Sequence, residues 1–184
     1  MFSIDPFKRL TLKEINTIIS TNQQLQLSDS AKKNITDCRN YLDKKIKSHP
    51  GPIYGINTGF GALCNVGIPD SDIEKLQENL VISHACGMGD EVPQEIVKLM
   101  LLLKIQALSY GKSGVQLPTV ERLVSFFNNN VLPVVYQLGS LGASGDLAPL
   151  AHLSLPLLGK GEVNYQNKKQ NAPDVLKTLK LEPI

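Results

Sequence analysis

A run of small residues is the part of this sequence whose types and spacing best suit covalent chemistry. It extends from Gly139 to His152 and contains Ala143-Ser144-Gly145 directly before Asp146. The same residue types also build ordinary tight turns into helices, because glycine accepts unusual backbone angles and aspartate caps a first turn. The residues alone therefore leave a structural turn and a reactive turn both open.

The reactive interpretation is a condensation of the backbone with itself. If the chain bends sharply at Ser144, the amide nitrogen of Gly145 can attack the carbonyl carbon of Ala143 and, with loss of water, close an imidazolone ring. Loss of a second water from the Ser144 side chain leaves an electrophilic methylidene group. Glycine leaves its nitrogen unobstructed, and the bend is required because a planar amide is a poor nucleophile. A helix that starts at Asp146 would direct free N–H groups toward the ring.

The run from Gly139 to about Ser154 resembles a signature of the aromatic amino acid ammonia-lyases, the family that includes histidine, phenylalanine and tyrosine ammonia-lyases. The resemblance implies that Ala143-Ser144-Gly145 forms 4-methylidene-imidazol-5-one (MIO) autocatalytically, and it implies no metal. Asp146 is expected to support this chemistry by capping the following helix and orienting the cyclising loop.

A second stretch, from Tyr54 to Gly61, combines turn-forming residues with two aromatic rings. Alone, it is typical of a connecting loop in which Tyr54 packs its ring and hydrogen-bonds its hydroxyl. Beside the first run, it resembles the family's second signature, a mobile lid loop whose tyrosine is assigned as the catalytic base. The resemblance gives that role to Tyr54, with Asn57 and Gly61 as supporting residues.

The pair Ser83-His84 lies near the end of a helix expected from Pro69 to about Ala85. A lone histidine on a partly apolar helix is usually structural. In the family, however, the two residues at this point contact the substrate side chain, and Ser83-His84 resembles the pair of histidine-specific members. Tyrosine-specific relatives tend to have His-Leu here and phenylalanine-specific ones Phe-Leu. An imidazole can hydrogen-bond the ring nitrogens of a substrate, so the resemblance implies L-histidine as the small-molecule substrate.

The remaining pattern predicts the helices that position these residues. Thr11 and Glu14 form a capping box before one helix, and a long apolar helix is expected from Gln94 to about Tyr110. Extended structure is expected only over residues 131–136 and in a hairpin over residues 161–171. The expected fold is mainly α, the N-terminal helical domain of the ammonia-lyase fold, with an irregular MIO-bearing loop and at most short β segments.

Composition narrows the class of protein. With 184 residues, 42% of them hydrophobic, the chain can form one soluble globular domain. A net charge of +2 is too small to indicate nucleic acid or a membrane surface as a partner. The 3 cysteines and 3 histidines show no metal-binding spacing, and unpaired cysteines favour a cytoplasmic location.

Length is the main departure from the family, whose members are far longer and continue into a helical bundle. Residues 1–184 are therefore interpreted as the N-terminal, MIO-bearing part, without the C-terminal bundle. The full-length protein is expected to be a homotetramer. The implied activity is non-oxidative deamination of L-histidine to trans-urocanate and ammonia. The alternatives are a tyrosine or phenylalanine ammonia-lyase or aminomutase, and a catalytically inert truncated fragment.

Overall fold

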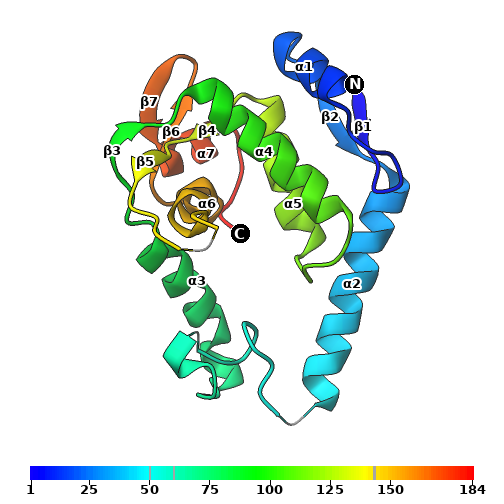
Figure 1. Cartoon of the computed structure of the whole chain (residues 1–184), viewed down its shortest axis with the longest axis vertical. Coiled ribbons are helices and arrows are strands. Elements are labelled where there is room, and N and C mark those ends of the chain that lie inside the picture. The colour runs from blue at the N-terminus through cyan, green and yellow to red at the C-terminus, as the bar shows by residue number, and fades with distance from the viewer. Residues whose placement is uncertain (50, 60, 143) are drawn as a thin grey trace.

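The computed structural model describes the chain apart from Pro50, Phe60, Ala143 and the side chain of Asp70. Over the described residues the fold is mainly helical, as the sequence predicts (Figure 1). The α-helices are α1 (Leu12–Ser20), α2 (Asp29–Ser48), α3 (Ile73–His84), α4 (Gln94–Ser109), α5 (Leu117–Asn128), α6 (Leu147–Ser154) and α7 (Ala172–Thr178). Three short 3-10 helices are also present: η1 (Gly61–Leu63), η2 (Asp70–Asp72) and η3 (Leu155–Leu158). In the described part of the chain, no helix is both long enough and apolar enough to cross a membrane.

Side-chain caps are present at the start of α1, where the sequence predicts a capping box, and at the start of α2. The Glu14 amide donates to Thr11 Oγ1 at 3.2 Å, and the Thr11 amide donates to Glu14 Oε2 at 2.9 Å, which completes the capping box of α1. Ser28 caps α2 by accepting a hydrogen bond from the Ala31 amide at 3.1 Å. These side chains satisfy amide groups that a helix start would otherwise leave unpaired.

The strands are short and form three small sheets: β1 (Phe2–Ile4) pairs with β2 (Leu25–Leu27), β3 (Met88–Glu91) with β5 (Tyr136–Leu138), and β6 (Glu162–Tyr165) with both β4 (Leu132–Pro133) and β7 (Lys168–Asn171). The β6–β7 hairpin and the extended residues before Gly139 were predicted. The sequence analysis missed the parallel β1–β2 pair. It also missed β3, because its exposed residues Met-Gly-Asp-Glu become a strand only by pairing with a segment far along the chain.

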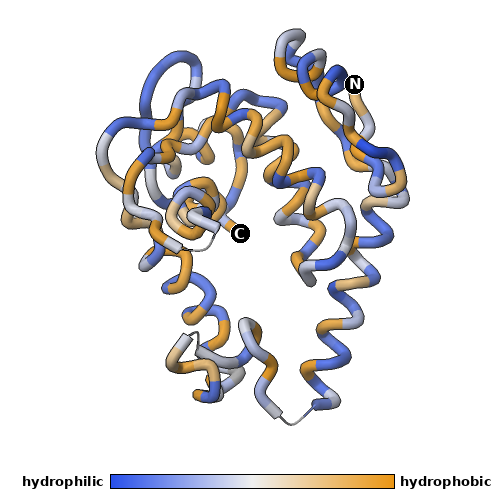
Figure 2. Tube along the Cα trace, viewed as in Figure 1, coloured by the Kyte–Doolittle hydropathy of each residue, from blue (hydrophilic) through white to orange (hydrophobic). Residues whose placement is uncertain are grey.

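The core surrounds α4. Leu101, Leu102 and Ile105 have no exposed surface, and α4 packs against α2, α5 and β4. Figure 2 shows that hydrophobic residues concentrate on α4 to α6, whereas α2 is mostly hydrophilic. The predicted long apolar helix from Gln94 is confirmed, but it is buried on one side only, because Ile96 and Leu103 are 48% and 45% exposed.

Helix α3 projects away from this core. It packs against α6 and η3, and none of its residues is fully buried. In Figure 1 the loop that follows α2 lies beside the start of α3, whereas α6 lies near the end of α3. The predicted site residues are distributed along this projecting part of the molecule.

Candidate active site

The predicted reactive run, from Gly139 to His152, contains the turn between β5 and α6 and the first part of α6. Ala143 lies outside the described residues, and Ser144 and Gly145 are exposed where the chain bends. Gly145 has a φ of +66°, and a Cβ built there would meet nothing within 4 Å. Its backbone angle, rather than crowding, explains the glycine. A bent backbone at a glycine beside an exposed serine is compatible with the predicted ring closure.

Asp146 occupies the N-cap position of α6, but its side chain makes no capping hydrogen bond. The expectation that this carboxylate caps the helix is therefore wrong. It instead accepts a hydrogen bond from the hydroxyl of Ser144, two residues earlier. Ser140 Oγ accepts from the Ala148 amide at 3.4 Å in the first turn of α6. This contact was not predicted, because the two residues are eight positions apart.

The Ser83-His84 pair lies at the C-terminal end of α3. His84 Nδ1 is 2.7 Å from the carbonyl oxygen of Leu80, and Ser83 Oγ donates to the same oxygen at 3.1 Å. Because a carbonyl oxygen can only accept, Nδ1 holds the proton in this contact. In the neutral ring, Nε2 is then a hydrogen-bond acceptor, which suits an N–H donor on a ligand.

The loop that contains Tyr54 is organised by its own hydrogen bonds. Asn57 Oδ1 accepts from the Ile53 amide at 2.6 Å, and the Ile68 amide donates to the Asn57 carbonyl oxygen at 2.8 Å. Gly61 starts η1 with a φ of +55°. The Asn57 hydrogen bonds lie within the loop and do not touch the reactive turn, and the supporting roles of Asn57 and Gly61 stay predictions.

Tyr54 is 64% exposed. Its loop lies beside the start of α3 in Figure 1, and the turn before α6 lies beside the end of α3. The chain thus brings the Ser83-His84 end of α3 to the reactive run, but it does not bring the Tyr54 loop there. The predicted mobility of this loop stays a prediction.

A lysine bridges the elements next to the reactive run. Lys169 Nζ is 2.9 Å from Glu162 Oε2 and 3.1 Å from Glu91 Oε1, and these carboxylates raise the pKa of Lys169 above its ordinary value. Its ammonium also lies 6.0 Å from the centre of the Tyr136 ring. The bridge joins the β6–β7 hairpin to β3, and so fixes the strand that follows the end of α3.

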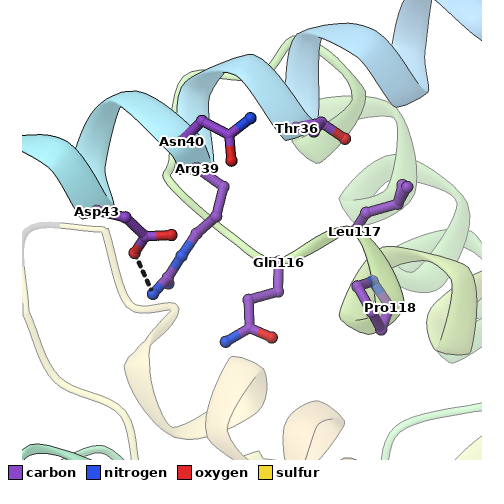
Figure 3. A pocket seen from close by; sticks show the side chains of 7 residues that line it. All are labelled: Thr36, Arg39, Asn40, Asp43, Gln116, Leu117 and Pro118. Carbon is purple, nitrogen blue, oxygen red and sulfur yellow. Dashed lines mark ion pairs between the residues drawn. The ribbon is translucent and has the colours of Figure 1, made fainter.

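A pocket of the described residues lies elsewhere, between α2 and the segment that leads into α5 (Figure 3). It measures about 320 Å³ and is lined by Thr36, Arg39, Asn40, Asp43, Gln116, Leu117 and Pro118. Arg39 and Asp43 form an ion pair at 2.7 Å within it. No predicted site residue lines this pocket, and the exposed positions of Tyr54, Ser83 and Ser144 indicate that further protein is needed to enclose a substrate.

Comparison with known sequences agrees with the predicted family. The family model described as "Aromatic amino acid lyase" matches residues 10–184. A histidine ammonia-lyase of Deinococcus radiodurans is 46% identical over 175 residues, which are 95% of this chain and 33% of that protein. One of Idiomarina loihiensis is 45% identical over all 184 residues and 35% of its own length.

Solved structures show the same fold. The phenylalanine aminomutase of Pantoea agglomerans superposes over 100% of this chain with a TM-score of 0.93 at 28% identity. A histidine ammonia-lyase of Trypanosoma cruzi gives a TM-score of 0.88 at 35% identity, again over 100% of this chain but 36% of that protein. The predicted fold is confirmed, and the chain spans about a third of the length of the relatives that it matches.

Proposed function

Because this chain belongs to the aromatic amino acid lyase family, we propose that it is the N-terminal, MIO-bearing part of a histidine ammonia-lyase. The observation that carries the proposal is the 45–46% identity to histidine ammonia-lyases over 95–100% of the chain. The likeness to an aminomutase is a likeness of fold at 28% identity. The complete protein would convert L-histidine to trans-urocanate and ammonia in the cytoplasm, as a homotetramer.

The reactive turn fits the proposed prosthetic group. Gly145 has the left-handed backbone angle of a sharp bend, and a Cβ built there would meet nothing within 4 Å, which suits a condensation between residues 143 and 145. Asp146 accepts the Ser144 hydroxyl hydrogen bond and so orients the group that leaves as water. Once formed, MIO supplies an electrophilic carbon that takes up the substrate amine and makes the nitrogen a better leaving group.

Substrate recognition is assigned to the end of α3. With its Nδ1 proton directed to the Leu80 carbonyl oxygen, His84 presents Nε2 as an acceptor for an imidazole N–H. Ser83 directs its own hydroxyl to the same carbonyl, and its oxygen, which lies 3.4 Å from His84 Nδ1, retains a lone pair that can accept. The pair thus offers acceptors to a substrate that brings a ring N–H.

Tyr54 is proposed as the base that removes the β-proton of the substrate. Its loop lies beside the opposite end of α3 from the reactive turn (Figure 1). It can therefore serve only after the loop moves, or by serving the turn of another copy of this chain. A homotetramer would supply such copies.

The proposal is tested on the complete protein that contains this chain. Intact-mass measurement followed by peptide mapping is expected to show the loss of two waters at residues 143–145. Urocanate absorbance is expected to rise with L-histidine and not with L-phenylalanine or L-tyrosine. Cinnamate or coumarate formation instead would identify the other branch of the family. Full mass without any product would favour the inert fragment.

A further inference from the structure

The two residues that follow α3 and its cap are held from both sides by the reactive run. The Gly87 amide donates to Nε2 of His152, on α6, at 2.9 Å. From the other side, a Cβ built on Gly139 would lie 2.8 Å from the Cys86 carbonyl oxygen and 2.9 Å from the Gly87 Cα. Cys86 Sγ is also 3.7 Å from the Gly139 carbonyl oxygen. Both ends of the run that contains Ser144 thus contact the same two residues.

The His152 side of this contact is built to accept a hydrogen bond. The residue is 8% exposed, and its ring meets the Tyr136 ring edge-on with centroids 5.2 Å apart. Because Nε2 accepts from an amide, the ring is neutral with its proton on Nδ1. Burial lowers the pKa of His152, which favours this neutral form.

Gly87 has no room for a side chain at this contact. A Cβ there would lie 2.9 Å from His152 Nε2 and 3.1 Å from the Tyr136 Cβ. The glycine therefore permits the close approach that places its amide on the imidazole. The histidine and the glycine thus act together in one contact, and neither was predicted as a site residue.

We propose that His152 is a positioning residue: it fixes the end of α3, and with it Ser83-His84, relative to the turn that contains Ser144. His152 lies on the helix that starts directly after that turn, and Gly87 lies three residues after His84, so the hydrogen bond joins the two halves of the site through α6 and a short segment after α3. The catalytic consequence rests on the proposed function. Misplacement of reacting groups by about 1 Å can cost about a hundredfold in rate.

Two substitutions separate the hydrogen bond from the volume of the ring. His152→Gln can place its amide oxygen where Nε2 lies and keep an acceptor, whereas His152→Phe keeps an aromatic ring and removes the acceptor. His49→Gln and His49→Phe, at the exposed C-cap of α2, are the matched controls. All variants are made in the complete protein.

The first measurement is amide hydrogen exchange at Gly87 and His84. His152→Phe is expected to speed exchange at both amides about tenfold or more, because the Gly87 amide loses its acceptor, and His152→Gln is expected to stay close to wild type. Unchanged protection of Gly87 in the phenylalanine variant would overturn the hydrogen bond. Faster exchange at Gly87 but not at His84 would show that this hydrogen bond does not fix the end of α3.

The second measurement is the kinetics with L-histidine. His152→Phe is expected to lower kcat/KM about 10- to 100-fold while the two waters are still lost, and His152→Gln to recover to within about threefold. Unchanged kcat/KM with loosened amides would overturn the positioning role. If the wild type does not deaminate histidine, the proposed function fails, while the exchange comparison still decides whether His152 fixes α3.

Should His152→Phe fail to fold, Gly87→Ala approaches the same contact from the opposite side. Its methyl group displaces the segment from Nε2, so it is expected to reproduce the loss of protection at His84. Wild-type protection at His84 in Gly87→Ala would contradict the proposal.

Discussion

The core around α4 and the projecting helix α3 differ in how deeply their side chains are buried. Leu101, Leu102 and Ile105 of α4 are fully buried, whereas α3 buries no residue completely and leaves Ile82 41% exposed. The predicted catalytic and substrate residues all lie outside α4 and α5, on α3, its preceding loop and the turn before α6. The core therefore fixes the fold, while the site residues remain open to whatever the complete protein packs against them.

Two buried polar side chains of α4 differ in their hydrogen bonding. Lys98 on α4 is 7% exposed, yet its ammonium donates to Asn22 Oδ1 at 2.7 Å and Asn130 Oδ1 at 2.9 Å. Both asparagines have positive φ and lie just after a helix, so the Lys98 ammonium bridges the turns that follow α1 and α5. Burial lowers the pKa of Lys98. Lys98 is therefore satisfied within the core, whereas Gln106 Nε2 on the same helix is buried without a hydrogen-bond partner among the described residues.

The largest effect is expected from Ser144→Ala in the complete protein. Without the hydroxyl, the second water cannot be lost and the methylidene carbon cannot form. The kcat for histidine should fall at least about a thousandfold, which corresponds to about 4 kcal/mol in activation free energy. The thermal midpoint should change little because Ser144 is exposed. Retained activity would show that the turn is structural only.

The next effect concerns the distance between the Tyr54 loop and the reactive turn. Tyr54→Phe is expected to lower kcat about 10²- to 10⁴-fold through loss of a positioned base. If Tyr54 serves another copy of the chain, co-expression with Ser144→Ala subunits should restore about a quarter of the sites in mixed oligomers. No recovery in verified mixed oligomers would place both groups of one site in the same chain.

A cavity-forming substitution in the core around α4 should strongly lower the free energy of unfolding. Leu101→Ala is expected to lower the free energy of unfolding by about 2–5 kcal/mol, because it leaves a cavity in a fully buried layer. Urea unfolding followed by circular dichroism measures this loss. Leu103→Ala on the same helix, where the side chain is 45% exposed, is the matched control and should lose far less.

Patterns among neighbouring residues were sufficient to predict the helix α4 of this core and the start of α1. The Thr11–Glu14 capping box and the apolar run of α4 depend on residues within a few positions of one another, and both are confirmed. The Gly87–His152 contact joins residues 65 positions apart, and β3 exists only through β5. Such contacts depend on the tertiary fold. The sequence therefore predicts which residues belong to the site, but not the long-range contacts that position them.

A smaller effect is expected from the pH dependence of stability. The pKa of folded His152 is lowered from its ordinary value of about 6.5, mainly by burial, so the unfolded chain binds more protons just below that pH. Its contribution should be complete above about pH 6.5 and decline as the pH falls toward the lowered pKa. The ring faces Tyr136, beyond which Lys169 pairs with Glu91 and Glu162.

Urea midpoints of wild type and His152→Gln between about pH 5 and 8 measure this contribution, because glutamine does not titrate. The difference between the two proteins should narrow or reverse as the pH falls through the window. Parallel curves would show that His152 has the same pKa in the folded and unfolded chains.

The smallest effect is expected on α3 itself. Ile82→Ala should change the free energy of unfolding of the 184-residue chain by less than about 0.5 kcal/mol, because its side chain already has 41% of its surface in solvent. In the complete protein the same change should cost clearly more if further protein covers this face. Equal small losses in both would mean that α3 stays exposed at Ile82 after assembly, and that the substrate site is closed from another side.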